Sequence, residues 1–303
     1  MLVSVIIPTY NRAGTIERAI ESVLAQSWKP IEIIVVDSHS TDGTMEILTA
    51  YGDRLRLILQ QRQGPALAKN AGIHAARGEI IAFLDSDDSW LPDKTERQVR
   101  LLQATRSSGV VCCVCNARME FARQTVYSFG VAGLVPQRQE GIWTNPAEVL
   151  TTRFLFFNQV VAVWREALER SGYFNQGIME DYDLALRLSL LGPWAFVAEP
   201  LVIWHEQVAD SLTRATNELQ RCVRTVEILQ SVRDSKLFGP LLPQDLLHHR
   251  MWFLEQRIEA LRMSAQARPI AGLFAMLRLK YLQFYEVLDR RLPATPRMIT
   301  RDV

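Results

Sequence analysis

Apolar runs alternate with helix-like segments along the first third of the chain. Runs rich in valine, isoleucine and leucine occupy residues 3–7, 31–36, 55–59 and 80–84. Segments with the apolar spacing of amphipathic helices lie between them, at residues 15–26, 44–51 and 66–76. Strands that alternate with helices pair into a mainly parallel sheet with helices on both faces. The pattern therefore predicts an α/β, Rossmann-like fold with a mainly parallel central sheet.

The pattern becomes less regular after about residue 110. Short strands, a stretch with glycine and proline at 130–146 and a helix at 180–191 are predicted there. Beyond residue 211 the pattern is helical to about residue 291. We therefore expect a main domain and a helical C-terminal extension. The bounds are 1–210 for the main domain, with halves at 1–115 and 116–210, and 211–303 for the extension.

The segment over residues 270–291 is apolar, with basic residues along or beside it: Arg268, Arg278, Lys280, Arg290 and Arg291. Many core helices have this composition, so we expect the segment to pack on the main domain or on a second copy of the chain, as in a homodimer. A peripheral helix on the inner face of a membrane has the same composition and is the alternative.

Composition and charge narrow the class of protein. The 34 basic and 33 acidic residues nearly balance, which argues against nucleic acid as a partner. No apolar run approaches the ~20 residues that span a bilayer, and Met1 leads into the first strand without the features of a secretory signal. Cys112 and Cys115 have CxxC spacing within a buried-strand pattern, so we expect packing rather than zinc. Unpaired cysteines suit the cytoplasm.

Polar residues cluster where the predicted strands end. The first run is followed by Pro8–Arg12, the second by Asp37–Gly43 and the fourth by Asp85–Asp88. Ligands of open parallel sheets bind at the carboxyl ends of the strands, so these segments are expected to line one edge. Asp85 and Asp87 face the same way in an extended chain. Two carboxylates and the oxygens of a diphosphate can hold Mg²⁺ or Mn²⁺, although aspartates are also common in plain turns.

Several segments together resemble glycosyltransferase family 2, whose members have the GT-A fold. The resemblance lies in Ser4–Arg12, Ile34–Thr44, Gly64–Gly72, Ala82–Asp88 and Gly177–Arg187. It covers about the first 210 residues and implies a GT-A domain. Its first half, 1–115, would bind the nucleotide-sugar and its second half, 116–210, would bind the acceptor.

The resemblance implies a role for each matching residue. Asp181 corresponds to the catalytic base, and Asp87 and His205 to the ligands of Mn²⁺ or Mg²⁺. The remaining matches correspond to the nucleotide-sugar site: Pro8, Thr9, Tyr10, Arg12, Asp37, Lys69, Asn70, Asp85 and Ser86. Ser38 and His39 depart from the family, since relatives often carry aspartate and glycine there.

Some of these residues have a simpler structural explanation. Asp37 would otherwise cap the turn that follows it, and Lys69 would otherwise lie on a solvated helix face rather than point its charge at a phosphate. A histidine at a strand end, such as His205, is often structural. Asp181 falls in the first turn of a helix, whose dipole is expected to keep it ionised and to limit its basicity. Asp183 and Arg187 are expected to form only an i,i+4 pair.

The implied reaction is a single in-line displacement. Asp181 takes the acceptor proton, the hydroxyl attacks the anomeric carbon with inversion, and the metal at Asp87 stabilises the diphosphate. UDP is the expected carrier, with TDP and GDP open. The acceptor would be a glycan or a lipid-linked acceptor in cell-surface polysaccharide or glycolipid synthesis. The alternative is a catalytically inactive nucleotide-sugar-binding subunit. A nicotinamide enzyme is disfavoured, since no Gly-x-Gly-x-x-Gly turn follows the first strand.

Overall fold

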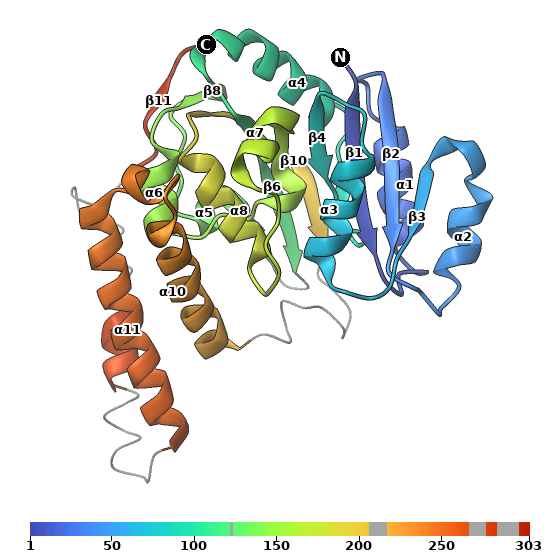
Figure 1. Ribbon diagram of the computed structural model, residues 1–303. Coiled ribbons are helices and arrows are strands. Elements are labelled where there is room, and N and C mark those ends of the chain that lie inside the picture. The colour runs from blue at the N-terminus through green and yellow to red at the C-terminus, as the bar shows by residue number, and fades with distance from the viewer. Residues whose placement is uncertain (122–123, 206–216, 267–276, 284–296) are drawn as a thin grey trace. The chain divides into compact units, whose positions relative to one another are not determined.

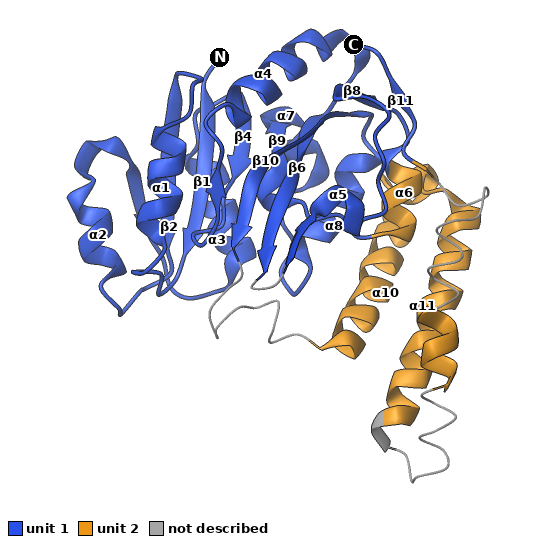
Figure 2. Cartoon of the chain, turned by 180° about the vertical axis from the view of Figure 1, so that it is seen from behind, with its two compact units in different colours: residues 1–146, 154–207, 298–303 blue, residues 147–153, 208–297 orange. Residues whose placement is uncertain are grey.

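The computed structural model describes residues 1–121, 124–205, 217–266, 277–283 and 297–303. The chain forms two compact units, coloured differently in Figure 2. The first unit contains residues 1–146, 154–207 and 298–303, and the second contains residues 147–153 and 208–297. Every residue assigned to the site from the sequence belongs to the first unit.

One mixed sheet forms the centre of the first unit (Figure 1). Its strands follow the order β11-β8-β10-β6-β9-β4-β1-β2-β3, with β5 paired to β10 and β7 paired to β6. The strands are β1 (Val3–Thr9), β2 (Ile31–Asp37), β3 (Arg56–Leu59), β4 (Ile80–Phe83), β5 (Ser89–Trp90), β6 (Cys112–Phe121), β7 (Gln124–Tyr127), β8 (Glu140–Trp143), β9 (Val161–Trp164), β10 (Trp194–His205) and β11 (Thr300–Arg301).

Helices cover both faces of this sheet, as the alternating pattern predicts. In Figure 1, α3, α7 and α8 lie on the near face, and Figure 2 shows α1 and α4 on the other. The helices of the unit are α1 (Ile16–Leu24), α2 (Thr44–Ala50), α3 (Pro65–Ala75), α4 (Lys94–Ala104), α5 (Ser128–Val131), α7 (Arg165–Ser171) and α8 (Glu180–Ser189). The α/β prediction is confirmed, and the predicted helices and strands of the first third match within a few residues.

Parallel pairing brings the strand ends of the first half together. β1 pairs in parallel with β2 on one side and with β4 on the other. Thr9 lies opposite Asp37, and Ile6 lies opposite Phe83. The turns that follow these three strands therefore open on the same edge of the sheet. This confirms the prediction that the polar strand ends share one edge.

Helix α3 packs unusually close to β1. A Cβ atom at Gly72 would clash with the side chain of Ile6, which is fully buried. Only glycine permits this approach without a shift of the helix. The close packing carries Lys69, one turn earlier on α3, into the interior of the unit.

The cysteines and the C-terminus also belong to the sheet. Cys112, Cys113 and Cys115 are buried and free in β6, which confirms that they pack as small apolar residues. The last residues return to the first unit, where Thr300 pairs with Trp143 and Arg301 with Ile142. The sequence pattern did not predict this short edge strand.

The second unit is helical in its described part. It contains most of α6 (Pro146–Thr152) together with α10 (Glu218–Asp234) and α11 (Gln244–Gln266). Asn217 and Gln220 form a capping box at the start of α10, and Arg257 of α11 donates to Glu218 at 2.6 Å. Within the described ranges, no helix is both long enough and apolar enough to cross a membrane. Of the segment 270–291, only residues 277–283 are described. Leu282 is buried there with Phe253 and Ala260 of α11, and Arg278 donates to Glu259 at 2.8 Å, so this part packs on α11 within the second unit. Packing on the main domain or on a second copy of the chain, and membrane contact, stay predictions.

Candidate active site

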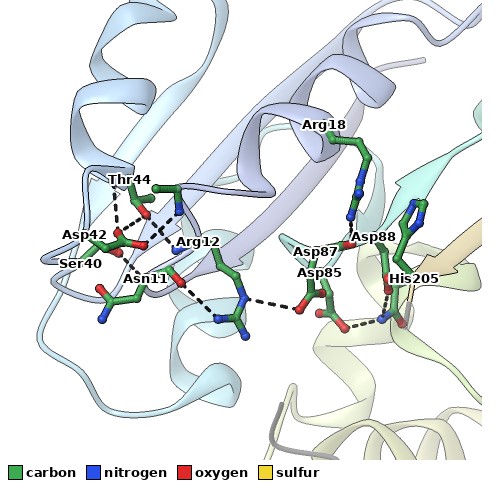
Figure 3. Close-up of polar contacts among 12 residues, drawn as sticks. Asn11, Arg12, Arg18, Ser40, Asp42, Thr44, Asp85, Asp87, Asp88 and His205 are labelled. Carbon is green, nitrogen blue, oxygen red and sulfur yellow. Dashed lines mark hydrogen bonds and ion pairs between the residues drawn. The ribbon is translucent and has the colours of Figure 1, made fainter. Parts of the chain in front are cut away.

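The turns after β1 and β2 are tied together by hydrogen bonds (Figure 3). The backbone N–H of Asn11 donates to Ser40 Oγ at 2.9 Å, and Asn11 Oδ1 accepts from the backbone N–H of Thr41 at 2.8 Å. The backbone N–H of Arg12 donates to Thr44 Oγ1 at 2.8 Å. Asn11 has a positive φ of 50°, which asparagine tolerates well. These bonds give this part of the edge a defined shape.

Asp37 caps the turn that follows it. Its fully buried carboxylate accepts from the backbone N–H of Ser40 at 2.9 Å and from the Ser40 hydroxyl. His39, inside this turn, has a φ of 67°, a left-handed conformation that favours glycine. A glycine at this position would adopt the same conformation without strain. Contact between Asp37 and a nucleotide base stays a prediction.

The other residues predicted at the end of β1 lie at the same edge. Thr9 is buried, and its Oγ1 has no hydrogen-bond partner among the described residues. Tyr10 stacks under Arg62, whose guanidinium carbon lies 4.0 Å from the ring centroid. Pro8 pairs with Val36 within the sheet. The edge therefore presents an aromatic ring with a cation over it, while the Thr9 hydroxyl is buried away from solvent.

The turn after β4 gathers three carboxylates, from Asp85, Asp87 and Asp88 (Figure 3). Burial raises the pKa of Asp85 to about 6, with Asp87 and Glu180 adding to the rise and Lys69 opposing it. Burial also raises the pKa of Asp87, against the nearby Arg12, and raises the pKa of Asp88 well above its usual range. Ser86, between them, is buried. The ionised forms of these carboxyl groups are therefore costly in the protein alone.

Gln159 holds this acidic turn from the side and was missed in the sequence. It lies in the short 3-10 turn Asn158–Val160 before β9. Its amide nitrogen donates to Asp88 Oδ2 at 2.8 Å and to a carboxylate oxygen of Asp85. Trp90 Nε1 donates to the backbone carbonyl of Gln159 at 3.1 Å. No local pattern marks a lone glutamine as functional, so only the fold reveals it.

Two arginines approach Asp87 from the β1–α1 region (Figure 3). Arg12 Nε lies 3.4 Å from Asp87 Oδ2, which brings two residues predicted for the site into contact. Arg18 donates to the backbone carbonyl of Asp87. Arg18 could not be recognised from the sequence, because its position on α1 resembles an ordinary polar helix face.

His205, at the end of β10, joins the same edge. Its backbone N–H donates to Asp88 Oδ1 at 3.2 Å, and its Nε2 lies 3.1 Å from Ser89 Oγ. Nδ1 lies 3.7 Å from Glu120 Oε2. Burial and the nearby Arg18 lower the pKa of His205, so the ring is neutral at pH 7. The predicted proximity of His205 to the acidic turn is therefore observed, and metal binding by it stays a prediction.

Lys69 is buried, so the solvated helix face considered for it is wrong. Its Nζ lies 2.8 Å from Glu180 Oε1 and 5.0 Å from the centre of the Phe174 ring. The neighbouring Asn70 exchanges two hydrogen bonds with the backbone of Phe174, at 2.9 and 3.0 Å. Both side chains thus link α3 to the segment that leads into α8.

Asp181 lies in the first turn of α8, as expected, but with a different acidity. Burial raises its pKa to about 7, Glu180 raises it further, and Lys69 opposes the rise. The expectation that the helix dipole limits its basicity is wrong, because burial and a neighbouring carboxylate outweigh the dipole. Asp183 pairs with Arg187, both buried, which confirms the expected i,i+4 pair. A carboxylate with a pKa near 7 suits a general base.

No ready-made metal site appears among the residues that the structure describes, in the sense of three or more converging histidine, cysteine or acidic side chains. The predicted site consists of Asp87, His205 and the diphosphate oxygens of the sugar donor, so metal binding stays a prediction.

A cavity of about 570 Å³ lies near the start of β4 and away from Asp87 and His205. It is lined in part by Arg77, Glu79 and Trp164.

The sequence matches the model of the family described as glycosyl transferase family 2 over residues 4–176. Among similar curated proteins is the putative teichuronic acid biosynthesis glycosyltransferase TuaG of Bacillus subtilis, 45% identical over 33% of this chain and 42% of that protein. Another is the succinoglycan biosynthesis protein ExoO of Rhizobium meliloti, 48% identical over 34% of this chain and 30% of that protein. These alignments thus span less than half of either relative.

Solved structures extend the comparison to nearly the whole chain. Staphylococcus aureus TarS 1–349, solved with UDP-GlcNAc, matches 98% of this chain and 82% of its own length, with a TM-score of 0.64 and 18% identity. The mannosyltransferase PcManGT of Pyrobaculum calidifontis, solved with GDP-Man and Mn²⁺, matches 94% of this chain and 83% of its own, with a TM-score of 0.62 and 25% identity. The predicted GT-A fold is confirmed. Because the family model covers more than half of its residues, the chain belongs to glycosyl transferase family 2.

Proposed function

We propose that this protein is an inverting glycosyltransferase that moves a sugar from a nucleoside diphosphate to an acceptor hydroxyl. One observation carries the proposal: Asp181, whose pKa is raised to about 7, interacts electrostatically with Asp85 of the acidic turn. A carboxylate with a pKa suited to a general base thus lies beside the edge of the sheet at which ligands of such folds bind. The alternative, a catalytically inactive nucleotide-sugar-binding subunit, would not need a carboxylate with this pKa at this place.

Asp181 would act as the general base. In its ionised form it accepts the proton of the acceptor hydroxyl while that oxygen attacks the anomeric carbon. The bond from this carbon to the diphosphate oxygen breaks in the same step, so the configuration inverts. Burial favours the neutral form of Asp181 and thereby strengthens the base when it is ionised.

The strand ends of β1 and β2 would hold the donor. The Tyr10 ring would offer a stacking surface to a nucleotide base. Thr9 lies at the same strand end, with its hydroxyl buried and unpartnered among the described residues. Asp37, already held by Ser40, would shape this pocket and contact the base. Asp85 and Ser86 would contact the ribose, and Arg12 would offer charge to the diphosphate.

Asp87 and His205 would supply part of the ligand set of a divalent cation, and the diphosphate of the donor would supply further oxygens. Burial raises the pKa values of Asp85, Asp87 and Asp88, and a bound cation would favour their ionised forms. Asp87 would be the main ligand, and neutral His205 offers a ring nitrogen. When bound, Mn²⁺ or Mg²⁺ would neutralise charge on the leaving diphosphate. The Mn²⁺ found with PcManGT supports this assignment.

The acceptor class follows from the relatives. TuaG and ExoO are named for the biosynthesis of teichuronic acid and of succinoglycan. We therefore place this chain in polysaccharide synthesis, with a glycan or a lipid-linked glycan as acceptor. UDP is the proposed carrier, and GDP and TDP are tested beside it.

The test is a thermal-shift panel with UDP, GDP and TDP and their common sugars, with and without Mn²⁺. We expect one diphosphate to raise Tm only when Mn²⁺ is present, and the rise to vanish in Asp87→Ala. Asp53→Ala, a change of an exposed aspartate, serves as the matched control and should keep the full shift. Stabilisation by no nucleotide would contradict the proposed donor site.

A further inference from the structure

Lys69 has the environment of a buried counter-ion and not that of a phosphate ligand. Lys69 is 1% exposed, and its ammonium group lies 2.8 Å from Glu180 Oε1. Glu180 is the first residue of α8, directly before the proposed base. The contact joins two residues that are 111 positions apart. A charge committed to this ion pair is not free to meet a diphosphate.

The surroundings of Lys69 form a two-point attachment between α3 and the entry to α8. Asn70 fixes the backbone of Phe174 by two hydrogen bonds, and the Phe174 ring lies under the Lys69 ammonium. The same ring packs edge-on against Phe83 of β4, with centroids 5.1 Å apart. The segment that leads to Glu180 and Asp181 is therefore held against α3 and β4 by Lys69 and Asn70, two consecutive residues of α3.

We propose that Lys69 and Glu180 are positioning residues for the base: their buried ion pair holds the first turn of α8 and sets the charge beside Asp181. The proposal rests on the proposed function in naming Asp181 as the base. It assigns to Lys69 a role different from the phosphate contact that the family resemblance implies.

The charges around Asp181 give the pair a measurable effect. Glu180 faces it from the same helix, Lys69 from α3 and Asp85 from the turn after β4. Asp183, further along α8, is engaged with Arg187. Glu180 and Asp85 favour the protonated form of Asp181, and Lys69 favours the ionised form. Removal of either partner of the pair therefore moves the titration of Asp181, in opposite directions.

The experiment is a titration of the aspartate carboxyl carbons by ¹³C NMR, with the Asp181 signal identified by its absence in Asp181→Asn. Glu180→Gln removes the like charge, so the Asp181 midpoint should move to lower pH by about one unit. Lys69→Met removes the opposite charge, so the midpoint should move to higher pH by a similar amount. Lys69→Arg keeps the charge and should leave the midpoint near its original position.

Lys94→Met is the matched control. Lys94 is likewise fully buried, but it contacts Gln98 and the Trp90 ring and does not face Asp181. Its loss should leave the Asp181 midpoint unchanged. If Lys69→Met does not fold, the Glu180→Gln titration alone decides. An unmoved midpoint in Glu180→Gln, or movement in the same direction in both variants, would overturn the proposal.

The titration needs no turnover, so it separates this inference from the proposed function. With an active donor and acceptor, the acidic limb of kcat/KM should follow the NMR midpoint in each variant. Midpoints that move as expected in a protein without transferase activity would support the ion pair and count against the proposed function. A loss of UDP affinity above tenfold in Lys69→Met, with the Asp181 midpoint unmoved, would restore the phosphate role.

Discussion

The amide nitrogen of Gln159 lies 2.8 Å from Asp88 Oδ2, and it also donates to Asp85. One neutral side chain thus supplies both of its N–H groups to two carboxylates that repel each other. Asp88 is fully buried and also accepts from the backbone N–H of His205, so loss of the Gln159 donor would leave its Oδ2 without this partner. The acidic turn after β4 keeps its shape because a residue 71 positions from Asp88 supports it.

Gln159→Met tests this support. Methionine keeps the length of the side chain but removes both donors, so the free energy of unfolding should fall by about 1–3 kcal/mol. The loss should be larger at pH 8 than at pH 5, because ionised carboxylates need the donor more than protonated ones do. Urea unfolding at the two pH values measures it. Gln103→Met, an exposed position on α4, is the control, and an equal effect there would contradict the assignment.

The pH dependence of turnover follows from the Asp181 pKa of about 7. A general base acts in its ionised form, so kcat/KM should rise with pH and level off above about 7. The measurement is donor consumption with acceptor between pH 5 and pH 9. A flat profile across pH 7, or activity that falls as pH rises through 7, would speak against Asp181 as the base.

Asp181→Asn separates chemistry from binding and also reports on stability. Turnover should be abolished, while the thermal shift given by the donor nucleotide persists. The folded-state pKa of Asp181 lies above the ordinary aspartate value of 3.8, so the folded state binds the extra proton between about pH 4 and pH 7. Wild-type stability therefore falls as pH rises through this window. The asparagine side chain cannot ionise, so the variant should gain Tm over wild type at pH 8 and little at pH 4.

His39→Gly relieves the left-handed backbone of the turn after β2. The cost of this conformation for a residue with a Cβ is about 1–2 kcal/mol. Glycine avoids this cost, but it also loses more conformational entropy on folding, which offsets part of the gain. We expect a net gain of up to about 1 kcal/mol in the free energy of unfolding. His39→Ala removes the side chain and keeps the strain, so a similar gain in that variant would show that strain is not the cause.

Gly72→Ala tests the close packing of α3 on β1. The new methyl group meets Ile6, so α3 must shift or Ile6 must change its rotamer, at a cost of about 1–3 kcal/mol. Gly14→Ala is the control, because a Cβ there meets nothing within 4 Å. Chemical unfolding of both variants measures the difference. An unchanged midpoint for Gly72→Ala would contradict the tight approach.

Local pattern was sufficient for the elements of the first third. Apolar periodicity and turn residues act over a few positions, so the strands and helices from Val3 to Phe83 could be predicted with small errors at their ends. The edge at which Thr9 and Asp37 meet followed from one further rule, that parallel strands end on the same side. Strand β11 was missed because two residues, Thr300 and Arg301, carry no periodicity.

The burial and the charged neighbours of individual side chains could not be predicted from the sequence. Lys69 was assigned to the nucleotide-sugar site, with a solvated helix face as the alternative. Asp181 looked like a carboxylate that the helix dipole keeps ionised. Lys69 is instead buried in an ion pair with Glu180, 111 positions away. Burial and the charge of Glu180 raise the pKa of Asp181. The sequence by itself determined the α/β order and which residue types stand at the strand ends, because those depend on near neighbours. Only the tertiary structure decided which charges face each other and how strongly water is excluded, and these two quantities set the proton affinity of the site.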